Sequence, residues 1–383
     1  MRVGILGGTF NPVHHAHIEM AKLAMQYASL DRVLLMVAAD PPHKTVADGV
    51  RAEVRFTMTQ LALVGLDGLE ACDLEIQRSG KSYTAETLES YHAVHPDDEL
   101  YLLVGSDMLR DFPTWYHPER ITALATILCI CRNGQSGGEE AAAKAIRTDF
   151  SGKVQVIPEM VSAISSTQIR ADLEAGIPIS ALVPPAVERY VYETGIYFSR
   201  EMQSMQRQVE KMLTPKRFRH TMGTVQSAAR LAALWDVDPK KAQTAALLHD
   251  CAKYMPEKKR ALYAGDDYDI ASVTHAFAGA VVAKTVFGVQ DDEILRAIRL
   301  HSTGDAGMTK LEMTVFLADV IEPNRDFEGV EAYRCKIAEG PEEAMRFALD
   351  CTMQVVKRLN FHLHPATQRA YYYFYGQKKE VLQ

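Results

Sequence analysis

A change in the spacing of apolar residues near position 195 is the feature that most constrains the fold of this chain. Before it, short apolar runs alternate with helix-like stretches at about residues 17–28, 51–64, 84–94 and 139–147. The runs are Val3 to Leu6, Val33 to Val37, Tyr101 to Val104, Ile127 to Ile130 and Val154 to Ile157. Strands that alternate with helices predict an α/β doubly wound parallel sheet, which binds its ligands at the carboxyl ends of the strands.

After Gly195 the alternation stops, and the remaining chain carries helical spacing only. The expected helices cover about residues 220–234, 240–252, 273–287, 291–301, 311–321 and 342–360. A chain of 383 residues is too long for one ordinary core, because domains average roughly 100 to 200 residues. We therefore expect an α/β domain over residues 1–198 and an all-α domain over residues 203–383.

Composition excludes several classes of protein. A hydrophobic content of 47% and a charged content of 24% are typical of a soluble globular protein. The net charge of −7 argues against a nucleic-acid binder. The sequence shows neither a run of about 18 apolar residues nor a signal peptide, so we expect a cytoplasmic protein without membrane association. The six scattered cysteines are expected to be reduced, and homo-oligomerisation stays open.

The first apolar run leads into Gly7-Gly8-Thr9-Phe10-Asn11-Pro12 and then into His14 and His17. Glycines let the backbone turn sharply beside a ligand, and a helix beginning near Pro12 or Val13 would place both histidines on one face. Two imidazoles beside a helix start suit an anion whose charge grows during a reaction. A lone Gly-Gly pair would be an ordinary turn, but the ordered string predicts a nucleotide-phosphate site.

Polar and aromatic residues follow the later strands, at the expected ligand edge of the sheet. Lys44 ends a Pro-rich loop, and Ser82-Tyr83-Thr84 opens a helix whose free amides can take a carboxylate. Asp107, after Gly105, can accept ribose hydroxyls, while Trp115 can stack on a flat ring. Arg132 follows the fourth run. Taken singly, these residues have ordinary interpretations as a solvated lysine, a helix cap and a core tryptophan.

The last strand leads into Ile164-Ser165-Ser166-Thr167-Gln168-Ile169-Arg170, before a helix that is expected to end near Gly176. Hydroxyl groups and free amides at a helix start form a phosphate cradle, to which Arg170 adds a charge one turn later.

Together, GGTFNPVHHAH, PPHK, SYT, GSDM with Trp115, and ISSTQIR resemble the bacterial nicotinate-nucleotide adenylyltransferases over residues 1–197. Asn11 and Ala16 depart from the usual Asp and Gly of that pattern. The resemblance implies a Rossmann-like nucleotidyltransferase fold and adenylyl transfer from ATP to nicotinate mononucleotide, which gives nicotinate adenine dinucleotide and pyrophosphate.

The resemblance also assigns roles to residues. It implies that His14, His17, Lys44 and Arg170 neutralise charge during the transfer, with Mg²⁺ on the triphosphate. Ser165, Ser166 and Thr167 would hold ATP, whereas Tyr83, Thr84 and Trp115 would hold the nicotinate. The full set expected to contact the substrates is Gly8, Thr9, Phe10, Tyr83, Thr84, Gly105, Asp107, Trp115, Arg132, Ser165, Ser166 and Thr167.

In the second half, polar residues fall where a helix would present an apolar face. His249 and Asp250 follow Ala-Ala-Leu-Leu, and Asp319 follows Phe316 closely. A buried carboxylate needs a partner, because burying it alone costs several kcal/mol, and a metal ion suits histidine and aspartate together. The candidate ligands are His220, His249, Asp250, His275, His301 and Asp319. His362 and His364 are interpreted as ordinary hydrogen-bonded residues.

This order resembles the HD superfamily of metal-dependent phosphohydrolases. Within it, HDCAK, THAFAGA, HSTG and ADVIEPNR resemble, over residues 203–376, the bacterial HD-domain hydrolases that cleave diadenosine tetraphosphate symmetrically into two ADP. The resemblance implies one or two transition-metal ions bridged by Asp250, with His275 and His301 at the second. Iron is expected, and Mn²⁺ fits as well. Lys253 and Arg325 would bind the polyphosphate oxygens.

The leading hypothesis is a bifunctional enzyme whose substrates are ATP, nicotinate mononucleotide and a dinucleoside polyphosphate. Two alternatives stay open. The HD half is a non-catalytic nucleotide sensor, or it hydrolyses another dinucleotide or nucleotide, such as the product of the first half.

Overall fold

The computed structural model describes the chain except for residues 42–48, 79, 133–137, 266–269 and 377–383. The chain divides into two compact units. The first comprises Met1–Ala171 with Ile179–Tyr190, and the second comprises Asp172–Pro178 with Val191–Gln383.

The first unit is built on a six-stranded sheet in the order β3-β2-β1-β4-β5-β6, and every neighbouring pair is parallel. The strands are β1 (Arg2–Gly8), β2 (Arg32–Val37), β3 (Leu69–Cys72), β4 (Glu99–Gly105), β5 (Ala125–Arg132) and β6 (Val154–Val161). This confirms the expected fold class. Strand β3 was not predicted, because four residues with a glutamate among them do not form an apolar run.

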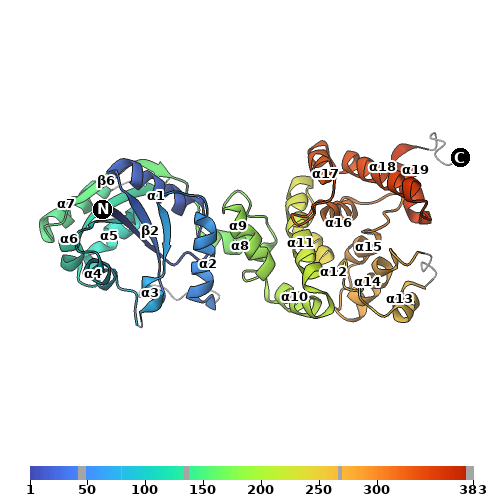
Figure 1. Ribbon diagram of the computed structural model, residues 1–383, viewed down its shortest axis with the longest axis horizontal. Coiled ribbons are helices and arrows are strands. Elements are labelled where there is room, and N and C mark those ends of the chain that lie inside the picture. Colours follow the sequence, from blue (N-terminus) through green and yellow to red (C-terminus); the bar gives the residue numbers. More distant parts are fainter. Residues whose placement is uncertain (42–48, 79, 133–137, 266–269, 377–383) are drawn as a thin grey trace. The chain divides into compact units, whose positions relative to one another are not determined.

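Helices lie against both faces of this sheet (Figure 1). In the first unit they are α1 (His15–Ala28), α2 (Ala52–Leu63), α3 (Leu74–Gln77), α4 (Thr84–Val94), α5 (Ser106–Asp111), α6 (Pro118–Leu124) and α7 (Glu139–Asp149). On one face, Ile5 and Leu102 pack with Leu88 of α4 and Ile146 of α7 in a buried cluster. The strand order reverses between β1 and β4, and the loops that follow these two strands therefore border a crevice.

Arg55 of α2 is the largest side chain that is fully buried in the chain as described. Its guanidinium donates hydrogen bonds to three carbonyl oxygens: Thr9 at 2.7 Å, Ala39 at 3.3 Å and Val50 at 3.3 Å. Thr9 lies in the loop after β1, and Ala39 follows β2. The buried cation thus joins two segments that border the crevice.

Replacing Arg55 with methionine is expected to lower the free energy of unfolding of the first unit by about 3 kcal/mol, because buried carbonyl groups lose a charged donor. Urea unfolding followed through Trp115 fluorescence, in a Trp235→Phe background, measures the change. Arg51→Met is the matched control, since Arg51 precedes the same helix and is exposed. Equal stability of the two variants would contradict this prediction.

The second unit is helical, and no strand occurs among its described residues. It contains α10 (Arg200–Met212), α11 (Pro215–Trp235), α12 (Pro239–Leu248), α13 (Glu257–Ala264), α14 (Thr274–Thr285), α15 (Asp292–Leu300), α16 (Lys310–Ile321), α17 (Val330–Lys336), α18 (Pro341–Leu359) and α19 (Pro365–Tyr375). Two further helices, α8 (Ser166–Ala175) and α9 (Pro185–Thr194), connect the units. Of the helices in the described part of the chain, none has both the length and the apolar character that crossing a membrane requires.

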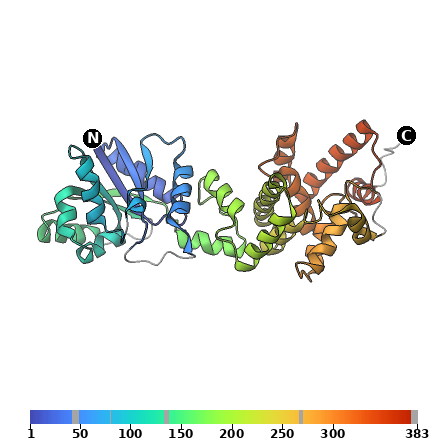
Figure 2. The same ribbon diagram turned by 60° about the horizontal axis from the view of Figure 1, so that its bottom comes forward.

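Helices α11, α12, α15 and α16 pack on one another as the core of this unit (Figure 2). The candidate metal ligands occupy defined places on this core. His220 lies inside α11, His275 in the first turn of α14, and Asp319 in the last turn of α16. His249 and His301 are the residues that follow α12 and α15. Helix packing therefore gathers residues that are far apart in the sequence.

Candidate active sites

A cavity of about 600 Å³ lies at the carboxyl ends of the strands in the first unit. It gathers fourteen of the residues expected to bind or catalyse. These are Gly8, Thr9, Phe10, His14, His17, Tyr83, Thr84, Gly105, Asp107, Trp115, Ser165, Ser166, Thr167 and Arg170. Lys44 lies outside the described residues. Arg132 ends β5, and its side chain is likewise outside the description.

The loop after β1 brings its aromatic and imidazole rings together. Phe10 has a left-handed backbone with φ of 47°, and its ring covers Gly8 so closely that a Cβ there would lie 2.8 Å from Phe10 Cζ. Position 8 therefore requires glycine. The His17 ring meets the edge of Phe10 at 4.9 Å and stacks on His14 at 3.7 Å, measured between ring centroids.

Helix α1 begins at His15, which is later than the expected start near Pro12 or Val13. His14 is its extended N-cap residue, and the His14 backbone N–H donates to His17 Nδ1 at 3.2 Å. The two rings thus meet through capping and stacking, not through a shared helical face. Because Nδ1 of His17 accepts, the neutral ring carries its proton on Nε2, where it is a donor.

The start of α8 is tied to the same loop. Ser166 Oγ donates to the Pro12 carbonyl at 2.9 Å, and Arg170 Nη1 donates to the Asn11 carbonyl at 2.7 Å. Ser165 Oγ accepts from the Gln168 N–H at 3.2 Å. The role of Asn11 was not predicted, because its backbone carbonyl, and not its side chain, accepts the hydrogen bond from Arg170. The expected phosphate cradle is therefore one connected structure made from both ends of the domain sequence.

Aromatic rings line the other part of the cavity. Tyr83 and Tyr116 stack with centroids 4.4 Å apart, and Trp115 also lines the cavity. Ser82 does not cap α4 as expected; its Oγ accepts from the Ala39 N–H at 3.0 Å and so ties α4 to the end of β2. Tyr116 was not predicted as a cavity residue, although its position next to Trp115 was a usable signal.

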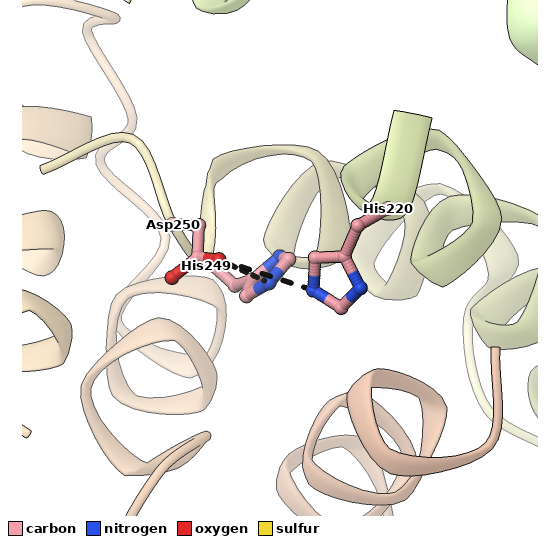
Figure 3. A group of neighbouring side chains, drawn as sticks. All are labelled: His220, His249 and Asp250. Carbon is pink, nitrogen blue, oxygen red and sulfur yellow. Dashed lines mark ion pairs between the residues drawn. The ribbon is translucent and has the colours of Figure 1, made fainter. Parts of the chain in front are cut away.

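The second candidate site lies in the other unit, where His220, His249 and Asp250 point toward one another (Figure 3). Asp250 Oδ2 is 3.3 Å from His249 Nε2 and 3.9 Å from His220 Nε2. Asp319 Oδ1 is 2.9 Å from His220 Nε2 and 3.9 Å from His249 Nε2. Two imidazoles and two carboxylates thus surround one point.

The other oxygen of Asp250 faces a different pair of histidines. Asp250 Oδ1 is 3.1 Å from His275 Nε2 and 3.9 Å from His301 Nε2. The six expected ligands form three overlapping groups, each with ligand atoms within 4.8 Å of one another. Asp250 therefore takes part in two of the three groups, with one oxygen toward each pair of histidines.

The donor atoms of this cluster fit a metal. Among the described residues, His249 Nε2 is buried at this centre without a hydrogen-bond partner. Burial would raise the pKa of Asp250, but His249 and the neighbouring imidazoles outweigh it and hold the pKa well below its usual range. Burial lowers the pKa of His301 to about 3, so its imidazole is neutral at pH 7. Neutral imidazoles with carboxylates are the ligand set of divalent transition metals.

Three cations border the cluster. Arg325 Nη2 lies 2.6 Å from Asp319 Oδ1, and Lys253 Nζ lies 3.8 Å from Asp250 Oδ1. The third, Arg217, was missed by the sequence analysis; its Nη1 lies 2.9 Å from Asp250 Oδ2. Its spacing of three residues before His220 on one helix was the available signal. The cluster thus combines candidate metal ligands with three cationic side chains.

Comparisons with known proteins match both halves. A family model described as cytidylyltransferase-like matches residues 5–172, and an HD domain model matches residues 217–324. The "Probable nicotinate-nucleotide adenylyltransferase" of Synechococcus sp. (strain JA-3-3Ab) is 39% identical over 196 residues, which are 51% of this chain and 94% of that protein. The protein of the same name from Thermus thermophilus is 39% identical over 197 residues, 51% of this chain and 100% of the relative.

Among solved structures, a "predicted HD superfamily hydrolase involved in NAD metabolism" from Clostridium acetobutylicum is 34% identical, with a TM-score of 0.44. The match covers 46% of this chain and 97% of that one. The sheet, the cavity residues and the near-complete coverage of the curated relatives agree on the first half, and helices with an HD match make up the second. The chain therefore belongs, through its first half, to the nicotinate-nucleotide adenylyltransferase family, and it continues into a helical HD domain.

Proposed function

We propose that the first half transfers the adenylyl group of ATP to nicotinate mononucleotide. The observation that carries this proposal is the single cavity that joins the β1 loop and the α8 start to Tyr83, Tyr116 and Trp115. Phosphate binds at the first part, and a flat pyridine ring suits the second. The names of the relatives support this choice of acceptor.

The proposed reaction needs positioning and charge neutralisation. A phosphate oxygen of nicotinate mononucleotide attacks the α-phosphorus of ATP, and the bond from that phosphorus to the pyrophosphate oxygen breaks. The nucleophile is already anionic, so no side chain has to remove its proton. Nε2 of His17 donates toward the phosphate groups, His14 and Arg170 support it, and Lys44 is proposed as a further cation. Mg²⁺ accompanies the ATP.

Incubating the intact protein with ATP, Mg²⁺ and nicotinate mononucleotide tests this function. Formation of nicotinate adenine dinucleotide and pyrophosphate in equal amounts is expected. Nicotinamide mononucleotide and phosphopantetheine serve as competing acceptors. A clear preference for either one would overturn the proposed acceptor, and absence of any dinucleotide would overturn the transfer.

Replacing Trp115 with leucine is expected to raise the KM for nicotinate mononucleotide about 10-fold, since stacking on an aromatic side chain contributes about 1–3 kcal/mol per base. The KM for ATP should stay unchanged. Initial rates measured with each substrate varied in turn separate the two constants. Trp235→Leu, in the other unit, is the matched control. An equal rise of both KM values would argue against a role of Trp115 on the acceptor side.

We further propose that the HD half is a metal-dependent hydrolase that cleaves diadenosine tetraphosphate into two ADP. The specific observation in its favour is the division of Asp250, whose two oxygens face two separate pairs of histidines. Divalent metal ions held there would supply Lewis-acid activation of water and phosphate. Iron is the proposed metal, with Mn²⁺ as the alternative.

The residues around the cluster would orient the substrate in this reaction. Arg217, Lys253 and Arg325, which border the ligand cluster, would bind the phosphate oxygens. Water adds to one of the two central phosphorus atoms, and the bond from that atom to the central bridging oxygen breaks. The two protons of the water balance the two ADP products.

Product analysis decides between hydrolase and sensor. The intact protein is given diadenosine tetraphosphate or nicotinate adenine dinucleotide, with Fe²⁺, with Mn²⁺ or with chelator. Two ADP from the tetraphosphate, lost with chelator, are expected. Cleavage of the nicotinate dinucleotide instead would replace the proposed substrate, and nucleotide binding without cleavage would make the HD half a sensor.

The proposal assigns adenylyl transfer to a domain of residues 1–198 and hydrolysis to a domain of residues 203–383.

A further inference from the structure

Glu322 is a carboxylate that is only 1% exposed and follows α16 at the edge of the ligand cluster. We propose that Glu322 is the positioning residue that fixes His220 for metal binding, by holding its ring orientation and its proton on Nδ1. This proposal rests on the proposed function of the HD centre as a metal site. Glu322 belongs to the sequence Ile-Glu-Pro-Asn-Arg and is not one of the six candidate ligands. The proposal gives it a role.

The contact itself defines the tautomer. His220 Nδ1 lies 3.1 Å from Glu322 Oε1, and a carboxylate accepts hydrogen bonds without donating them. Nδ1 of His220 therefore carries a proton. Nε2 faces the centre, where Asp319 Oδ1 lies 2.9 Å away, and a metal ion bound there would take its lone pair.

His220 needs a side-chain acceptor because of its place in the helix. His249 and His301 direct Nδ1 to the carbonyl oxygens of Ala246 and Ile298, at 2.6 and 2.8 Å. Those carbonyls belong to the last turns of α12 and α15, where the helix leaves carbonyl groups without an intrahelical partner. His220 lies in the interior of α11, where the carbonyls one turn before it are used by the helix. Glu322 supplies the acceptor that the backbone cannot.

The surroundings hold the glutamate in this position. A Cβ at Gly223 would lie 2.2 Å from Glu322 Oε2, so the glycine one turn after His220 makes room for the carboxylate. Glycine inside a helix is less stable than alanine, so its presence here points to the room that the carboxylate needs. Glu322 Oε2 also accepts from the Asn324 backbone and side-chain nitrogens, at 2.7 and 2.9 Å. Both oxygens are therefore engaged, and one of them is fixed on His220.

Glu322 acts through His220 and is not itself a ligand in this arrangement. It is absent from the groups of potential ligands found among the described residues. Carboxylates that orient a ligating histidine typically change metal affinity about 10- to 100-fold when they are replaced. The same range is expected here.

Two variants test the proposal in the full-length protein. Glu322→Gln keeps the shape but offers an amide that donates as well as accepts, while Gly223→Ala displaces the carboxylate without removing it. Both are expected to bind Mn²⁺ about 10- to 100-fold more weakly, measured by calorimetry and by electron paramagnetic resonance. Nitrogen NMR of ¹⁵N-histidine-labelled, metal-free protein should show that His220 loses the Nδ1 proton that Glu322 holds in the unaltered protein. Adenylyl transfer should be unchanged.

Glu312→Gln is the matched control, because Glu312 is another glutamate of 1% exposure, located at the first turn of α16. It should lower stability without weakening Mn²⁺ binding. Unchanged Mn²⁺ affinity in both test variants, or an unchanged His220 tautomer, would overturn the role of Glu322. If the unaltered protein binds no Mn²⁺ and no Fe²⁺, the metal centre fails instead, and the tautomer measurement still decides whether Glu322 orients His220.

Discussion

His17→Ala lowers the kcat of adenylyl transfer by about 10²- to 10³-fold, the usual effect of removing one preorganised donor to a developing charge. The His17 ring is held by the His14 N–H and by the rings of Phe10 and His14, so it is oriented before substrates bind. The loss should therefore appear in kcat more than in the KM for ATP. Dinucleotide formation at saturating concentrations of both substrates measures it.

His15→Ala is the control for this experiment. His15 is the first residue of α1 and is not among the residues that line the cavity. Its replacement removes an imidazole from the same segment without touching the site. If the His17→Ala and His15→Ala variants have the same kcat, the proposed electrostatic role of His17 is wrong. This conclusion does not depend on the identity of the acceptor.

Asp250→Asn removes the hydrolase activity of the HD half, by at least about 10³-fold, since metal-based charge stabilisation is worth several kcal/mol. Both oxygens of Asp250 face imidazoles, and an asparagine keeps one oxygen and loses the negative charge. The metal content of the purified protein should fall along with the activity. Elemental analysis and ADP release measure the two effects, while adenylyl transfer is expected to stay at the level of the unaltered protein.

Asp326→Asn serves as the comparison, because Asp326 is an exposed carboxylate of the same unit. It should retain both metal and hydrolysis. Full hydrolysis by the Asp250 variant would refute the proposed centre. Loss of hydrolysis with retained metal would limit Asp250 to substrate binding.

Much of the fold followed from the sequence, because its long elements carry complete patterns. The apolar runs at β1, β2, β4 and β5 stood out because parallel strands inside a sheet are buried on both faces. The run at β6 was found although this edge strand is partly exposed. Short elements such as β3 and α5 contain too few residues to show a repeating apolar pattern. Their conformation depends on tertiary contacts instead. The start of α1 was misplaced for a related reason: the N-cap is His14, a residue without a capping preference.

The candidate sites were predicted where several functional residues lie close together in the sequence. The motifs around His14, Ser165 and Asp250 are recognisable from the spacing of their residues, and the structure brings these residues together. Arg55 and Glu322 were missed because they act across 46 and 102 residues of sequence, on Thr9 and His220. A buried arginine bonded to carbonyl groups leaves no local pattern, and a glutamate that orients a histidine resembles any other glutamate until the fold places it.

The reversal of strand order between β1 and β4 has a consequence for how such a protein diversifies. The loop after β1 and the start of α8 form one side of the crevice, whereas the residues before α4 and after β4, including Ser82, Tyr83 and Trp115, form the other. Replacements in the second group leave the contacts of the first intact. A descendant can therefore exchange one acceptor for another by small steps, while it continues to use the same nucleotide donor throughout.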